Sequence, residues 1–183
     1  LQLAKKVEEG LFHSEIDYWN TVTKITPNLK LFVSGKNPLE SEVSRYISKI
    51  NHEKLNLFTS LEIESLILTS VASSIFDKNE HGEVIIELER HGRDALKEFD
   101  TANVVGWFTA SFPIRLTKLE NIELEMSTTK ALLDTIPSNG CGFTSLVALE
   151  HAEQDKLDIN GFFSHCQISF NYLGNLSAEK NHI

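Results

Sequence analysis

The densest cluster of residues that could do chemistry is ELERHGRD at 87–94. The cluster follows an apolar strand, which delivers Glu89 to the start of the loop RHGRD and can place it at the rim of a cleft. Partial removal of a carboxylate from water raises its proton affinity and makes it a better base, whereas a neighbouring arginine opposes that shift. Glu89 is therefore a candidate general base. The alternative is that Glu89, His91 and Arg93 form an ion-paired surface turn.

Other segments carry polar or aromatic groups where a site could form. Trp107 and Phe108 can line a pocket, or they can belong to the core, as aromatic residues on a strand often do. The turn IPSNGCGF can offer backbone amides to an anion at a helix N-terminus, or it can be only a tight connection. Asn171 and Tyr172 interrupt an apolar strand, which indicates either functional side chains or buried structural hydrogen bonds.

Composition excludes several classes of function. The net charge of −9 argues against nucleic acid and anionic lipid as partners, because both favour clustered Lys and Arg. No apolar run is long enough to span a bilayer, and the seven histidines lack metal-ligand spacing. GxSxG, P-loop and GxGxxG motifs are also missing. Cys141 and Cys166 lie in apolar or Gly-rich settings, which predicts two buried free thiols in a reducing cytoplasm.

Hydrophobic periodicity and turn residues predict the elements that position these groups. Helices are predicted, in chain order, over residues 1–25, 53–76, 121–136 and 143–151. Strands are predicted over residues 29–34, 83–89, 104–116 and 167–174, with a further exposed strand around Val43, Ile47 and Ile50. This interleaving indicates an α/β fold, a two-layer sandwich of a mixed sheet with packed helices, in one domain spanning 1–183.

The order of the motifs carries a family resemblance. ERHGRD, NVVGWFTASFPIRL, IPSNGCGF and ISFNYLGNL resemble the last four signature motifs of epimerization domains in nonribosomal peptide synthetases. Those motifs read EGHGRE, RTVGWFT-xx-YP, a Pro-containing Gly-rich turn, and FNYLGQF. LFHSEIDYW is similar to the helix with a Glu-xx-Tyr-Trp pattern just past the midpoint of such domains. Ordinary condensation domains typically have Phe-Val-Asn-Thr in place of Trp107-Phe108-Thr109.

The resemblance implies a fold, a substrate and site residues. The fold would be the second, C-terminal lobe of the two α/β lobes of a chloramphenicol acetyltransferase-like domain, with the substrate channel between the lobes. Glu89 would be the acid/base group at the α-carbon, and Arg93, Asn171 and Tyr172 would lie near the channel. The substrate would be an aminoacyl or peptidyl thioester on the 4'-phosphopantetheine arm of a carrier protein, with no cofactor bound directly.

Several residues depart from the family pattern. Arg90 replaces a glycine and is expected to place a bulky cation beside the proposed base, and Asn103-Val104 and Phe112 replace Arg-Thr and Tyr. The HHxxxDG motif, which supplies a histidine on the other side of the channel, does not occur in the 183 residues. An N-terminal lobe and a carrier protein are therefore the expected partners, and the chain alone is expected to be inactive. The alternatives are a non-catalytic docking domain for a carrier protein or tailoring enzyme, and a condensation-type acyltransferase lobe.

Overall fold

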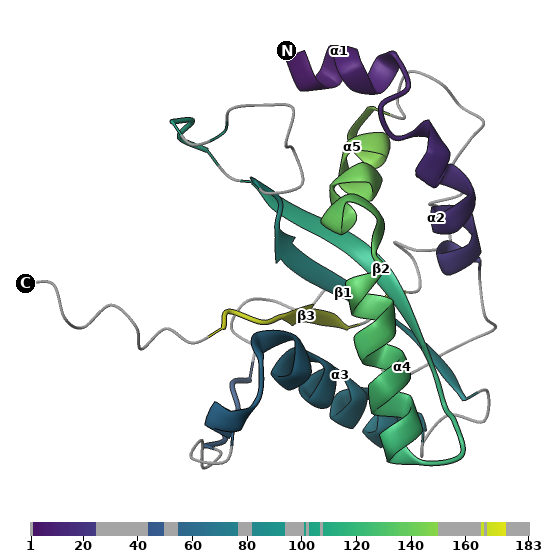
Figure 1. The fold of residues 1–183 in the computed structure, drawn as a ribbon, viewed down its shortest axis with the longest axis vertical. Coiled ribbons are helices and arrows are strands. Elements are labelled where there is room, and N and C mark those ends of the chain that lie inside the picture. Colours follow the sequence, from purple (N-terminus) through teal and green to yellow (C-terminus); the bar gives the residue numbers. More distant parts are fainter. Residues whose placement is uncertain are drawn as a thin grey trace, which may run out of the picture.

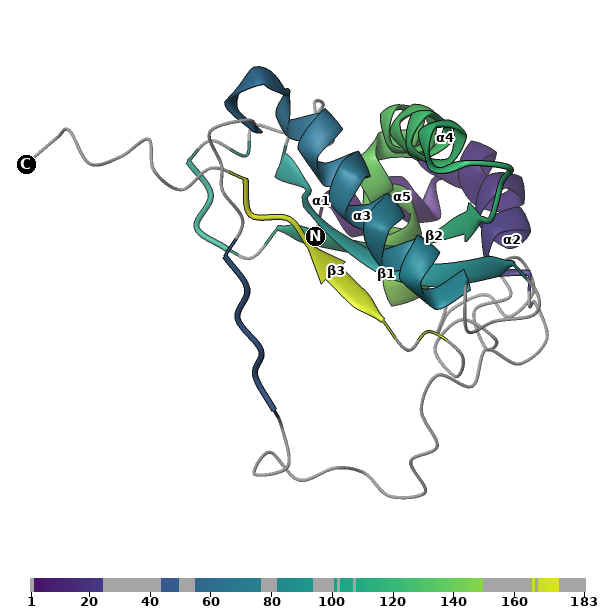
Figure 2. The same ribbon diagram turned by 90° about the horizontal axis from the view of Figure 1, so that it is seen from below.

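In a computed structural model of the chain, a small mixed sheet is covered by helices on one face (Figures 1 and 2). The structure describes residues 2–24, 44–49, 55–76, 82–93, 101, 103–106, 108–149, 166 and 168–174. The helices are α1 (Gln2–Glu8), α2 (Ile16–Thr23), α3 (Ser60–Phe76), α4 (Ile122–Asp134) and α5 (Cys141–Leu149). The strands are β1 (Glu83–His91), β2 (Thr109–Thr117) and β3 (Ser169–Asn171).

The sheet has the order β2-β1-β3. The β1 and β2 strands are antiparallel and pair from Glu83 opposite Thr117 to His91 opposite Thr109. The β3 strand runs parallel to β1, with Leu88 opposite Phe170. The predicted α/β class with a mixed sheet is confirmed.

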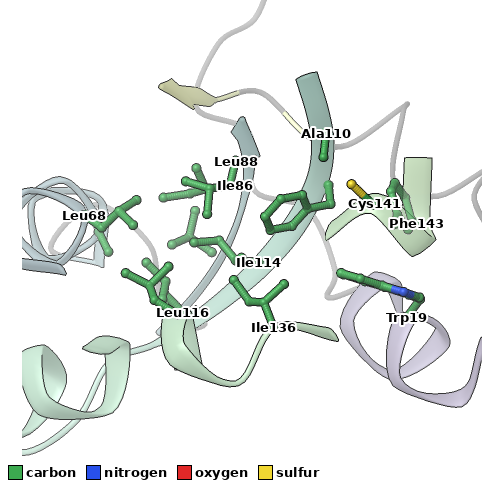
Figure 3. Packing of buried hydrophobic residues seen from close by; sticks show 14 of the residues in the cluster. Trp19, Leu68, Ile86, Leu88, Ala110, Ile114, Leu116, Ile136, Cys141 and Phe143 are labelled. Carbon is green, nitrogen blue, oxygen red and sulfur yellow. The ribbon is translucent and has the colours of Figure 1, made fainter. Parts of the chain in front are cut away.

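Alternation along the two long strands fixes which face the helices cover. Successive strand side chains point to opposite faces, so every second residue of β1 and β2 can enter the core. The residues that do so are Val84, Ile86, Leu88, Ala110, Phe112, Ile114 and Leu116. Leu68 of α3, Ile136 and Phe143 belong to the same core (Figure 3). The centre of the Trp19 ring of α2 lies 5.2 Å from that of Phe143 and 5.9 Å from that of Phe112.

The prediction of a single helix over 1–25 is wrong, because the first helix ends just before Gly10. Gly10 has a φ of 100°, its N–H donates to the Val7 carbonyl at 2.9 Å, and the Leu11 N–H donates to the Lys6 carbonyl at 3.0 Å. This pair of bonds is the Schellman motif, which ends a helix with a residue in the left-handed conformation. The apolar spacing continues across the break, so periodicity alone did not reveal it.

Three strand predictions also differ from the structure. Residues 44–49 have no regular secondary structure, and Tyr46 and Ile47 are 92% and 79% exposed, so the predicted strand there is wrong over the described residues. The strand predicted over 104–116 begins only at Thr109. The strand predicted over 167–174 is paired only across Ser169–Asn171, and the one at 29–34 lies outside the described residues.

Helices α3 and α4 begin at side-chain caps. Thr59 and Glu62 form a capping box, with the Thr59 N–H donating to Glu62 Oε2 at 2.9 Å and the Glu62 N–H donating to Thr59 Oγ1 at 3.3 Å. The Asn121 side chain accepts from the Leu124 N–H at 2.9 Å, as the predicted start of a helix near 121 requires. Of the helix predicted over 53–76, only Ser60–Phe76 is α-helix, and it follows a 3₁₀ turn at Leu55–Leu57. The helix predicted over 143–151 starts two residues earlier, at Cys141.

Lys130 of α4 ties that helix to the first turn of α3. Its Nζ lies 2.8 Å from Glu62 Oε1, and this bond, together with those from Thr59, lowers the pKa of Glu62 to about 2. The folded state therefore gains stability above the ordinary carboxyl value of 4.5, and loses it as pH falls toward 2. We expect Glu62→Gln to be less stable than the parent at pH 6, with the difference closing between pH 4.5 and 2. Urea unfolding at several pH values measures this.

The outer edge of β2 is closed by α5. Thr144 Oγ1 accepts from the Ser111 N–H at 3.0 Å and donates to the Ser111 carbonyl at 2.9 Å, so one side chain satisfies both edge groups of that residue.

Within the described ranges, no helix is long and apolar enough to span a bilayer, and no three metal-ligating side chains cluster. Cys141 is a buried free thiol, as predicted. Cys166 is also free but only half-buried.

Candidate functional site

Glu89 lies on the sheet face opposite the helices. Leu88 points into the core, so the alternation of β1 turns Glu89 to the other side, where it is half-buried. Glu87 shares this face and accepts a hydrogen bond from the Ser111 hydroxyl. Glu89 is thus inside a strand that continues to His91, and not at the start of a loop.

Asn171 is brought to Glu89 by the parallel pairing of β1 and β3. The two residues are register partners, and Asn171 Nδ2 donates to Glu89 Oε2 at 2.7 Å. Hydrogen bonds to an ionised carboxylate are short and stronger than neutral ones. Among the described residues, no donor to the other oxygen, Oε1, is found. Two sequence motifs that are 82 residues apart therefore form one contact.

Arg90 does not sit beside Glu89, contrary to the expectation from sequence. It follows Glu89 on the strand and points to the helix face, where Nη2 lies 2.9 Å from Glu64 Oε2 of α3. Its Nη1 donates to the Leu133 carbonyl at 3.2 Å and to Asn139 Oδ1 at 3.0 Å. The cation is neutralised on the far side of the sheet from the proposed base.

Arg93 binds the loop that precedes β2. Its guanidinium donates to the carbonyls of Thr101 at 2.6 Å, Val104 at 3.0 Å and Gly106 at 3.3 Å, and it lies 4.0 Å from the centre of the Phe108 ring. No hydrogen bond or ion pair joins it to Glu89 in the described part of the chain, so its contacts are those of a loop-ordering residue.

The aromatic candidates divide into two sets. Phe108 packs against the core under Arg93, which supports the core interpretation, and Trp107 lies outside the described residues. Tyr172 follows directly after β3 and is half-buried. No contact of Tyr172 with Glu89 or Arg93 occurs among the interactions that the described residues make. Its role at the channel stays a prediction.

The turn IPSNGCGF is not an open anion site, because the chain's own Glu15 occupies it. Glu15 is 8% exposed and accepts from the Ser138 hydroxyl at 2.5 Å and from the Trp19 indole N–H at 3.0 Å. A Cβ on Gly142, in the first turn of α5, would lie 2.0 Å from Glu15 Oε2. The internal carboxylate thus fills the helix N-terminus that a substrate oxyanion would need.

Two glycines of these motifs allow close packing. A Cβ on Gly92 would lie 2.6 Å from the Phe108 carbonyl oxygen and 2.7 Å from Cys141 Sγ. A Cβ on Gly140, which has a φ of 84°, would lie 1.8 Å from the Phe112 ring.

Burial, with a smaller contribution from Glu15, raises the pKa of Cys141 to about 11, so this thiol is inert at neutral pH.

Large peptide synthetases contain segments similar to the chain. Gramicidin S synthase 1 of Brevibacillus brevis is 26% identical over 98% of the chain, and Tyrocidine synthase 2 of Brevibacillus parabrevis is 27% identical over 97%. The chain spans only 17% and 5% of these two proteins. No protein-family model matches the chain.

A solved structure decides the family. The crystal structure of the epimerization domain from the third module of tyrocidine synthetase B matches with a TM-score of 0.74 and 28% identity, over 94% of this chain and 42% of that one. The chain is a C-terminal lobe of the epimerization/condensation type. The resemblance inferred from the motifs is confirmed, and the lobe spans less than half of the solved domain.

Sequence reasoning missed the buried polar groups of the lobe. Glu15 belongs to the Glu-xx-Tyr-Trp pattern, and its burial has one local signal, the Trp19 indole four residues later, which can reach it along a helical turn. Glu64 of α3 is also buried, with 8% of its surface exposed. A charged residue on a helix face that must be buried indicates a partner, but it does not identify Arg90.

The Asn171 contact makes a prediction about stability. Asn171→Ala removes one hydrogen bond to a carboxylate. Such bonds contribute up to about 1.5–3 kcal/mol to the free energy of unfolding. Because Asn171 is exposed, we expect the loss of stability to be smaller than this. Urea unfolding of the chain measures the loss. Ser169→Ala, on the same strand and also exposed, is the matched control and should cost less. Equal effects of the two substitutions would show that the contact contributes nothing.

Proposed function

We propose that this lobe supplies one side of the proton-transfer site of an epimerization domain. The substrate is an aminoacyl or peptidyl thioester carried on the phosphopantetheine arm of a carrier protein, and the reaction converts its L centre to D. The observation that carries the proposal is the Glu89 carboxylate, which is held by Asn171 on the sheet face opposite α3 and α4.

The reaction needs a base and a returning proton. Glu89 takes the α-proton, and the electron pair of the C–H bond passes toward the thioester carbonyl, which bears enolate-like charge. A protonated group on the opposite face of the α-carbon then returns a proton, and the thioester is regenerated with the other configuration. Proton exchange with solvent restores both groups for the next turnover.

The arrangement of Glu89 suits the first step. Asn171 holds Oε2 of the carboxylate and thereby fixes the orientation of the whole group. Oε1 can then face the substrate. Arg90, the cation nearest in sequence, is paired with Glu64 across the sheet and does not compete for the carboxylate. A fixed general base with an available oxygen is the element that such a reaction requires.

The second proton-handling group comes, in this proposal, from an N-terminal lobe. The 183 residues contain no HHxxxDG motif. The chain matches 42% of the solved epimerization domain, which leaves room for such a lobe in that domain. The face that carries Glu89 is the surface on which the second lobe would close the channel.

Reconstitution tests the proposal. The chain is combined with the N-terminal lobe of an epimerization domain and supplied in D₂O with a carrier protein loaded with an aminoacyl thioester. Deuterium at the α-carbon is measured by mass spectrometry, and configuration by chiral chromatography after thioester cleavage. We expect deuterium uptake and a mixture of L and D residues, with neither produced by the chain alone.

Other outcomes would overturn it. Carrier binding without exchange would indicate a non-catalytic docking domain. Amide formation with a second loaded carrier, without exchange, would indicate a condensation-type acyltransferase. Exchange that persists without the side-chain carboxylate at position 89 would place the base elsewhere.

A further inference from the structure

The side chain of Arg90 binds two segments that are distant from it in the sequence, helix α3 and the turn before α5. Its side chain is 17% exposed and that of its partner Glu64 is 10% exposed. The two are joined by Nη2 to Oε2 at 2.9 Å and Nε to Oε1 at 3.4 Å, a two-point pairing of guanidinium and carboxylate. Such a pair fixes orientation as well as position, because both groups are planar.

A second set of contacts links Arg90 to the turn before α5. Nη1 donates to Asn139 Oδ1 at 3.0 Å, and Asn139 Nδ2 donates in turn to the His91 carbonyl at 3.2 Å. Asn139 and its neighbour Ser138 have φ values of 49° and 44°, a conformation that costs free energy in non-glycine residues. The Asn139 amide thus bridges the side chain of Arg90 to the backbone of the next residue.

The residues on both sides of Glu89 are therefore fixed. Leu88 is fully buried, the Gly92 N–H donates to the Phe108 carbonyl at 2.7 Å, and the Cys141 thiol donates to the Gly92 carbonyl at 3.3 Å. Between these anchors, Arg90 and His91 are held by Glu64 and Asn139. The backbone at Glu89, and with it the direction of the carboxylate, has little freedom to move.

We propose that Arg90 is a positioning residue for Glu89, acting from the opposite face of the sheet through Glu64 and Asn139. This inference rests on the proposed function, since it concerns the aim of the same carboxylate. A misplacement of about 1 Å can lower the rate of a step that depends on near-contact geometry by roughly a hundredfold. Binding of the substrate, which involves many other contacts, would change little.

The test distinguishes a change in the orientation of the Glu89 carboxylate from unfolding of the lobe. Arg90→Met alone leaves Glu64 buried without a partner and can unfold the lobe, so the decisive variants are Glu64→Met/Arg90→Met, which removes both charges, and Asn139→Gly. The latter removes the bridging amide and keeps a residue suited to the left-handed turn. Lys130→Met, which breaks the more exposed pair with Glu62, is the control.

Two readouts are used for each variant. The first is the side-chain amide NMR signal of Asn171 in the 183-residue chain, since its hydrogen exchange slows when the amide donates to Glu89. The second is kcat and KM for α-proton exchange in the chain reconstituted with an N-terminal lobe. For the two decisive variants we expect faster Asn171 amide exchange and a fall in kcat of about tenfold to a hundredfold, with KM unchanged. Lys130→Met should change neither.

The outcomes distinguish this inference from the proposed function. An unchanged Asn171 signal and unchanged kcat in the folded double variant would overturn the positioning role, and so would an equal effect of Lys130→Met. If the parent protein shows no exchange at all, the proposed function fails. The Asn171 signal then still decides whether Arg90 controls the position of Glu89.

Discussion

Glu89→Gln should lower the rate of α-proton exchange by about 10²- to 10⁴-fold in the chain reconstituted with an N-terminal lobe, because a positioned general base contributes about that factor. The substitution keeps the shape of the side chain. The amide oxygen of glutamine can still accept from Asn171, which now bonds Glu89 Oε2 at 2.7 Å. Thermal unfolding should therefore change little, and the loss should fall on kcat.

Glu87→Gln is the matched control for this prediction. Glu87 has the same side chain, lies two residues away on the same strand and face, and is held by the Ser111 hydroxyl instead of Asn171. Exchange should stay close to the parent rate in this variant. Equal losses in the two variants would mean that the acidity of the face matters and that neither carboxylate is the base.

Arg90→Met should lower the free energy of unfolding by about 3–5 kcal/mol, since removal of one partner leaves a buried charge uncompensated. Glu64 is 8% exposed, so water cannot replace the lost guanidinium well. The double variant Glu64→Met/Arg90→Met removes both charges and should be more stable than the single variant. Its remaining deficit comes from the Leu133 carbonyl and the Asn139 amide, which lose a donor. Urea unfolding of the three proteins measures these differences.

The control for the buried pair is the more exposed one. Lys130 and Glu62 have side chains 43% and 30% exposed, so Lys130→Met should cost much less than Arg90→Met. A double-mutant cycle gives the coupling between Arg90 and Glu64 directly. If Arg90→Met costs as little as Lys130→Met, the pair is not a buried anchor, and the positioning role of Arg90 loses its basis.

Local patterns accounted for the elements whose residues interact with near neighbours. The β-branched run at 84–86 predicted β1, and the capping Asn121 agrees with the predicted start of α4. Where the local signal was ambiguous the predictions were wrong. Gly10 ends a helix within an unbroken apolar periodicity, and Ile47 lies in a stretch without a strand partner among the described residues.

The candidate site was predicted in part. The resemblance singled out Glu89 and Asn171, and the parallel register of β1 and β3 brings them within 2.7 Å. Arg93 was also singled out, and its guanidinium orders the loop at 101–106. The sequence left open whether IPSNGCGF is an anion site or only a tight connection. In the structure Glu15, a residue more than a hundred positions earlier, occupies this turn, and no local pattern could place it there.

The sequence by itself determined the family and the identity of the strand that carries the carboxylate. These follow from residue order and from periods of two to four residues, which depend on near neighbours alone. Only the tertiary structure decided that Arg90 pairs with Glu64, that Asn171 meets Glu89, and that Glu15 closes the α5 N-terminus. Each of these contacts joins segments far apart along the chain, and it forms only once strand register and helix packing have brought their side chains together.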